Sequence, residues 1–433
     1  MSILLTIVFG LLILGILVFV HELGHFIAAK SCKIRVLTFS LGFGNALIKR
    51  QVGETEYRIS TIPFGGYVRM AGEDPEKKQG AMDEYSSKPI YQRAIVAAAG
   101  PFSNVLFALL FLWIAYMYGI EMPQYMNDTT IGAVLPNTSA SAAGFQPGDS
   151  IIAIDGQPIT SWEEIQQFLL RRNELYQITF LRRNQKKSIT FSIQFEKGEV
   201  TGGLVPPIPA QIGNVEQNSP AAEAGLEKGD LVLFINGDTI YSAIQLTNMI
   251  ESWNQGDKPL QITVNRQDSV FSTSAVPRYS DELQKPVLGV AVAVPPSETV
   301  SYSPIEAFQK SLNQAWEFAT LIFRVLGMLF TGRASTGELA GPVGIIQVSG
   351  QIAQQSLSAV LIFMALLGIN LALINLLPLV ITDGGVLLFL LIEAVRGKPL
   401  SEKTQSLINR IAILFFLALF LFLTFNDVLR IAK

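Results

Sequence analysis

Long apolar runs divide the chain. Four of them predict membrane-spanning helices: Ile3–Ala29, Ala94–Ile120, Leu357–Ile381 and Ile411–Phe425. The first run is uncharged except for Glu22, and its stretch from Ile3 to Val20 would extend about 27 Å as a helix. It lacks a basic start and a small-residue cleavage site, so we expect a membrane anchor and not a signal peptide.

A fifth apolar stretch, Gln314–Phe330, is interrupted by Glu317 and Arg324. We therefore expect a helix at the membrane interface rather than another span. Between the first two spans, Ile34–Met70 contains alternating and β-branched segments with glycines at 42, 44, 65 and 66. This pattern predicts a small antiparallel sheet with tight turns.

The region between the second and third spans contains an internal repeat. Aligning Ile131–Ile159 with Ile212–Ile240 needs no gap and gives 12 identities in 29 positions. Each copy predicts a strand, an Ala-Gly turn, Gly-Asp, a second strand and a turn, followed by a helix at about 162–172 or 243–254. This order resembles tandem PDZ domains of the bacterial type. Such domains can add a peptide to an open sheet edge, but two spacers that bind no peptide are an equal alternative.

Basic residues follow the first span, precede the second, and lie between the third and fourth: Lys30, Lys33, Arg35, Lys49, Arg50, Lys88, Arg93, Arg396, Lys398, Lys403 and Arg410. The positive-inside rule places these segments in the cytoplasm. Both termini and the repeats are then expected to face outward.

Composition agrees with a membrane protein that has soluble parts. Hydrophobic residues make up 49% of the 433 positions and charged residues only 15%, against roughly 25% charged in soluble chains. The net charge of −3 provides no basic patch for nucleic acid, which we exclude as a partner. The single cysteine, Cys32, excludes an intrachain disulfide.

The only two histidines flank a glutamate in His21-Glu22-Leu23-Gly24-His25, at the inner end of the first span. Positions four apart share a helix face, so both imidazoles can reach one zinc ion with Glu22 beside it as a general base. Polar residues inside an apolar run are costly to insert, which favours a functional role. The metal is thus expected within the membrane, toward the cytoplasm.

Zinc needs a third protein ligand, and the remaining candidate types are carboxylates. Asp383 stands out because it follows Asn375-Leu376-Leu377-Pro378 and precedes Gly384-Gly385 near the end of the third span. The proline and glycines can break the helix and turn the carboxylate inward. Its alternative role is to cap the next helix.

With these residues assembled, the chain resembles the site-2 protease family of intramembrane zinc metalloproteases. The resemblance covers nearly the whole chain and includes further motifs: Ser40–Gly44, Thr61–Tyr67, Ala99-Gly100-Pro101 with Asn104, and Gly341–Ile345. It implies that His21, His25 and Asp383 bind zinc, that Glu22 is the base, and that Asn375 holds substrate or the developing oxyanion. Val380 and Thr382 depart from the usual proline and leucine of the last motif.

The resemblance also implies the location, a bacterial inner membrane with the termini and the repeats in the periplasm, and it implies the substrate. It suggests a single-span membrane protein already trimmed outside the membrane, such as an anti-sigma factor, with signal-peptide remnants as a second class. Two rival functions remain open: a membrane-anchored zinc peptidase of loop or soluble peptides, and an inactive scaffold that binds partners through the PDZ pair.

The predicted fold is a multi-pass α-helical membrane protein of about four spans, with a small membrane-associated β-sheet and two periplasmic PDZ-like α/β domains. The expected organisation is a first span with the zinc motif (1–30), a β-rich segment (31–93), a second span (94–120), two PDZ-like domains (125–200 and 205–280), a linker with the interfacial helix (281–356), a third span with the Asn/Asp motif (357–392), a cytoplasmic loop (393–410), and a fourth span with the C-terminus (411–433).

Overall fold

The computed structural model describes residues 3–74, 79–169, 175–192, 202–280, 283–330, 341–379 and 382–401, and scattered positions from 404 to 424. Two compact units emerge: residues 1–120 with 300–433, and residues 121–299. The second unit is thus inserted into the chain of the first. The predicted fourth span, 411–425, falls largely outside the described residues.

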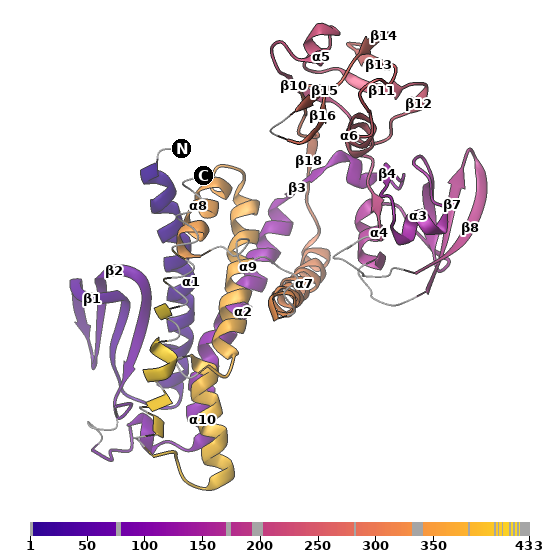
Figure 1. Ribbon diagram of the computed structural model, residues 1–433. Coiled ribbons are helices and arrows are strands. Elements are labelled where there is room, and N and C mark those ends of the chain that lie inside the picture. The colour runs from indigo at the N-terminus through magenta and orange to yellow at the C-terminus, as the bar shows by residue number, and fades with distance from the viewer. Residues whose placement is uncertain are drawn as a thin grey trace. The chain divides into compact units, whose positions relative to one another are not determined.

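The first unit is built on three long apolar helices, α1 (Ile3–Ser31), α2 (Ile90–Tyr118) and α9 (Leu357–Leu376). Within the described part of the chain, these are the three helices long and apolar enough to cross a membrane. Figure 1 shows α2 beside α9, and both α1 and α9 contact it. Their shared contacts bury small and branched side chains, including Ala108, Leu112, Ala365 and Ile369.

The third predicted span is interrupted. Helix α9 ends at Leu376, and a new helix, α10 (Asp383–Arg396), begins at the candidate ligand. Two further helices complete the unit. Helix α7 (Pro304–Phe330) packs on α2 and α9, and it begins ten residues before the predicted interfacial helix. Helix α8 (Pro342–Ile352) packs on α1.

The segment after α1 forms the expected antiparallel sheet from two long strands, β1 (Val36–Val52) and β2 (Thr55–Met70). The first half of β1 pairs on both sides: Thr38 lies opposite Arg69 and also opposite Glu56. The chain therefore curls so that residues 66–70 form one outer edge of the sheet. A short 3-10 helix, Tyr85–Ser87, then leads into α2.

The inserted unit contains two similarly built modules. In the first, a four-stranded sheet has the order β6-β5-β7-β8, and the strand after the Ile-Gly pair, β4, pairs with β9. Its elements are β4 (Ala133–Val134), α3 (Ser139–Ala143), β5 (Ser150–Ile154), β6 (Gln157–Pro158), α4 (Trp162–Leu169), β7 (Leu175–Arg182), β8 (Gln185–Ser192) and β9 (Leu204–Val205).

The second module repeats this topology, with sheet order β12-β11-β13-β14 and β10 paired with β17. Its elements are β10 (Ile212–Val215), α5 (Pro220–Glu223), β11 (Leu231–Ile235), β12 (Asp238–Thr239), α6 (Ala243–Glu251), β13 (Leu260–Arg266), β14 (Ser269–Ala275), β15 (Arg278–Ser280), β16 (Lys285–Val287) and β17 (Val290–Val292). Because β17 pairs with β10, this module includes residues up to Val292.

The same ion pair recurs in both modules. Arg182 binds Asp149 and the Gly144 carbonyl, and Arg266 binds Asp230 and the Gly225 carbonyl. Both aspartates come from the Gly-Asp pair of the repeat, so the guanidinium ties that pair to the Ala-Gly turn. The inserted unit is flanked by β3 (Ile120–Pro123) and β18 (Ser297–Val300), which pair with each other; a 3-10 helix, Gln124–Asn127, follows β3.

Candidate metal centre

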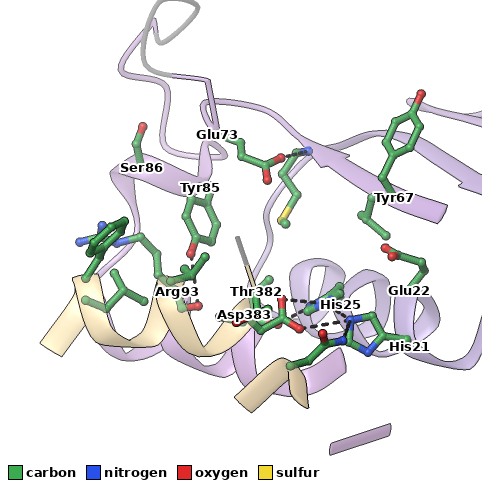
Figure 2. Close-up of a pocket in the computed structure, with 18 of the residues that line it drawn as sticks. His21, Glu22, His25, Tyr67, Glu73, Tyr85, Ser86, Arg93, Thr382 and Asp383 are labelled. Atoms are coloured by element: carbon green, nitrogen blue, oxygen red, sulfur yellow. Dashed lines mark hydrogen bonds and ion pairs between the residues drawn. The ribbon is translucent and has the colours of Figure 1, made fainter. Parts of the chain in front are cut away.

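Three predicted ligands lie together. His21 and His25 occupy successive turns of α1, and their Nε2 atoms are 3.2 Å apart. Asp383, the first residue of α10, faces both: its Oδ2 is 3.1 Å from His21 Nε2, and its Oδ1 is 3.3 Å from His25 Nε2. Figure 2 shows the three side chains converging from the two helices.

These distances suit zinc. Tetrahedral coordination with metal–ligand distances near 2.05 Å separates neighbouring ligand atoms by about 3.3 Å. In addition, the buried Asp383 Oδ2 accepts no hydrogen bond from the described residues. A carboxylate whose two oxygens each face an imidazole nitrogen, one of them without a hydrogen-bond donor, is an arrangement that a cation would stabilise. The donor set and its spacing therefore fit the metal.

Hydrogen bonds on the far side of each ring orient the imidazoles. His25 Nδ1 lies 2.7 Å from the Val96 carbonyl oxygen, which only accepts, so Nδ1 carries the proton and Nε2 is free to ligate. His21 Nδ1 lies 3.1 Å from the Asn104 amide nitrogen, and the buried Oδ1 of the same amide accepts no hydrogen bond from the part of the chain that the structure describes. Turning that amide by 180° satisfies Oδ1 with the His21 Nδ1 proton and leaves His21 Nε2 free as well.

In the sequence, Asn104 belongs to the motif that begins at Ala99, but the sequence does not predict its contact with His21. The contact spans 83 residues and depends on the register between α1 and α2. Glycines set that register. A Cβ on Gly100 would lie 2.3 Å from His25 Nε2, and one on Gly24 would lie 2.3 Å from the Ala99 carbonyl oxygen. Close helix packing at this point thus needs both glycines.

The break between α9 and α10 brings Asp383 to the histidines. Pro378 follows α9, and the Thr382 hydroxyl donates to the carbonyl oxygens of Leu377 and Leu379 at 2.9 and 2.7 Å. The Thr382 N–H also donates to the Leu379 carbonyl oxygen at 2.9 Å, so Thr382 ties together the turn between the two helices. A Cβ on Gly384 would lie 2.2 Å from the Leu377 carbonyl oxygen, so the turn requires glycine there. The departure at Thr382 thus supplies a turn-stabilising hydroxyl, and Val380 lies outside the described residues.

The three ligand candidates line a cavity of about 900 Å³. Glu22 lies on its wall with Gly66 beside it, because a Cβ on Gly66 would come within 3.1 Å of Glu22 Cγ. Asn375 also lines the cavity, and its Nδ2 is 3.4 Å from His21 Nε2. All five predicted site residues therefore meet at one cavity.

Further titratable groups lie in the cavity wall beyond the metal site, on the segment that follows β2. Partial burial raises the pKa of the Glu73 carboxyl, and the Met70 N–H that donates to its Oε2 at 3.0 Å opposes this. Burial likewise raises the pKa of the Tyr85 phenol. Figure 2 shows Glu73 and Tyr85 across the cavity from Glu22.

Comparisons with known proteins agree with this site. The model of peptidase family M50 matches residues 9–419. The regulator of sigma E protease of Haemophilus influenzae is 35% identical over 445 residues, covering 96% of this chain and 97% of that protein. A Pasteurella multocida protein whose name designates a zinc metalloprotease is 35% identical over 446 residues, covering 97% and 98%.

The regulator of sigma-E protease RseP of Escherichia coli is 31% identical over 443 residues, covering 96% of this chain and 97% of that protein. Among solved structures, the PDZ domain of an SdrC-like protein from Listeria monocytogenes matches 21% of this chain and 90% of its own length, at 22% identity and a TM-score of 0.18. That structural match carries no weight for the fold.

The chain therefore belongs to peptidase family M50, the site-2 protease type of metalloprotease. It is an enzyme, and its metal is zinc. The alternative function as an inactive scaffold that only binds partners is therefore excluded.

Proposed function

We propose that this protein hydrolyses a peptide bond within or next to the transmembrane segment of a pre-trimmed single-span membrane protein. The observation that carries the proposal is the position of His21, His25 and Asp383 at one cavity between helices apolar enough to span a membrane. The sigma-E names of the relatives support an anti-sigma factor as the substrate class, with signal-peptide remnants second. The bacterial inner membrane is the proposed location.

The residues take the following roles. His21, His25 and Asp383 hold zinc. When bound, zinc supplies Lewis acidity that polarises a carbonyl and lowers the pKa of water toward 7. Glu22 accepts the proton of the attacking water and then delivers it to the leaving amine. The Asn375 amide donates toward the oxyanion that develops on the scissile carbonyl.

A helical substrate hides its amides in its own hydrogen bonds and must unwind before attack. The edge of the sheet at residues 66–70 supports a way to hold the unwound segment, because Gly66, Tyr67, Val68 and Met70 line the same cavity as Glu22. A substrate strand added to this edge would be held by main-chain bonds beside the metal centre.

The inserted modules are proposed to be two PDZ-like domains on the periplasmic side. The topology that they share supports two copies of one fold. They either exclude substrates with bulky outer domains or bind a peptide at a sheet edge.

The experiment that tests the proposal combines metal analysis with cleavage of a model single-span substrate by the purified full chain in lipid vesicles. We expect about one zinc per chain and cleavage within or beside the span. Glu22→Gln should keep the zinc and lose the cleavage, because an amide cannot accept the water proton. If the protein cleaves a detached soluble peptide and leaves the single-span substrate uncleaved, it is instead a membrane-anchored peptidase of soluble or loop peptides.

A further inference from the structure

Among the described residues, four acidic side chains line the cavity, and three of them have a partner or a proposed role. Asp383 faces the histidines, Glu22 is the proposed base, and Glu393 binds Arg93. The fourth, Glu73, has no such partner among the described residues that line the cavity. Its Oε2 accepts the Met70 N–H, while its side chain stays exposed to the cavity. The nearby Arg69 is directed to Thr38, with its Nη2 3.1 Å from Thr38 Oγ1.

The place of Glu73 in the fold indicates what it can meet. It follows the outer edge strand 66–70 by three residues, at the end where the chain leaves the sheet. The cavity is also lined there by Pro399, Leu400 and Gln405, from the segment after α10. Basic residues follow both segments in the sequence: Lys88 and Arg93 after the first, and Lys398, Lys403 and Arg410 in and after the second. By the positive-inside rule, we expect this end of the cavity on the cytoplasmic side.

Substrates bring a matching charge to that side. The cytoplasmic flank of a single-span protein carries an excess of lysine and arginine, by the same positive-inside rule. If a substrate strand pairs with residues 66–70, the basic cytoplasmic flank of the substrate therefore lies close to Glu73. The Glu73 carboxylate lines the cavity and feels the charge of Arg69, but it forms no salt bridge with any described residue. Such a carboxylate suits an ammonium or guanidinium group.

We propose that Glu73 is a specificity-determining residue that binds a lysine or arginine side chain in the cytoplasmic flank of the substrate and so fixes where along the span cleavage occurs. This inference rests on the proposed function. The contact is formed in the bound substrate and not within the chain itself, so it acts on substrate selection and leaves the metal centre unchanged.

The experiment compares model substrates with a basic or a glutamine flank, using the full chain in lipid vesicles. Glu73→Gln keeps an acceptor for the Met70 N–H but removes the charge. We expect it to lower kcat/KM about tenfold for the basic flank, to leave the glutamine flank unchanged and to retain full zinc. The matched control is Asp74→Asn, which removes the neighbouring charge outside the cavity lining and should discriminate as the wild type does.

A charge exchange completes the test. Glu73→Lys should cleave a substrate with an acidic flank better than one with a basic flank, reversing the wild-type preference. Equal loss on all flanks in Glu73→Gln, or no preference in the wild type, would overturn the assignment of Glu73. Failure of the wild type to cleave any span substrate would instead overturn the proposed function, so the two outcomes are distinguishable.

Discussion

Arg93 on α2 and Glu393 on α10 form a bidentate ion pair. The guanidinium Nη2 is 2.6 Å from Glu393 Oε1, and Nη1 is 3.1 Å from Oε2. Both side chains are largely buried, at 14% and 16% exposed. Because Asp383 begins the helix on which Glu393 lies, the pair fixes α10 against α2 at a second point.

Breaking this ion pair should make the position of the Asp383 carboxylate, the proposed third zinc ligand, less fixed. We expect Arg93→Gln to cost about 3 kcal/mol of folding stability, since it leaves a mostly buried charge without its partner, and to weaken zinc binding several-fold. Exchanging the charges, with Arg93→Glu and Glu393→Arg together, should restore part of the affinity. Zinc competition with a chelator measures the effect, and a double variant no better than the single ones would contradict it.

Replacing Asp383 separates ligation from proton transfer. Asp383→Asn should lower both zinc occupancy and cleavage, because a neutral amide is a weaker donor to the metal. Glu22→Gln is its matched comparison, since it should lose only cleavage. Metal analysis of the two purified variants checks this, and full zinc with full activity in Asp383→Asn would place the third ligand elsewhere.

A methyl group at Gly100 should disturb the same ligands from the opposite side. It would fall 2.3 Å from His25 Nε2 and 2.8 Å from His21 Cε1. We expect Gly100→Ala to reduce zinc affinity at least tenfold while the chain still inserts and folds. Gly15→Ala on α1 is the control, because nothing lies within 4 Å of the added carbon. Equal zinc affinity in the two variants would argue against this packing.

The ion pair of the second module predicts a pH dependence. Burial opposes ionisation of Asp230, but the hydrogen bonds from Arg266 and the Glu227 N–H together outweigh it and lower the pKa. The stabilisation is therefore present above the unfolded pKa of about 3.9 and is lost as the pH falls through the folded value. Asp230→Asn should destabilise the module at pH near 7 and much less near 2, as hydrogen exchange in β11 and β13 would measure. A penalty independent of pH would exclude this linkage.

Removing residues 121–299 tests the two roles of the inserted unit. If the modules exclude bulky substrates, the shortened chain should cleave an untrimmed substrate that the full chain rejects. Point changes along the paired strands of either module, near Ile131 or Ile212, should then have little effect on a trimmed substrate. If those changes block cleavage while outer-domain size has no effect, recognition by strand addition takes the place of exclusion.

The sequence predicted three of the described helices and the clustering of the candidate site residues because their signals are local. Apolar length marks α1, α2 and α9, and a spacing of four brings His21 and His25 to one face. The proline and glycines around Asp383 correctly predicted a broken helix. The double pairing of β1 and the contact of Asn104 with His21 were not predicted, since they depend on how distant segments meet. The position of Glu73 in the cavity wall was not predicted either, for the same reason.

The pairing of β3 with β18 has a consequence for how the protein can be assembled and altered. Because the chain enters and leaves the inserted unit through one two-stranded ribbon, the entry and exit points are adjacent. Because the two ends of the inserted unit are adjacent, another domain whose termini lie equally close could replace this unit. Such a replacement would not pull apart the helices that carry the proposed metal ligands. The inserted modules can thus be exchanged without altering the chain path of the unit that contains the candidate metal centre.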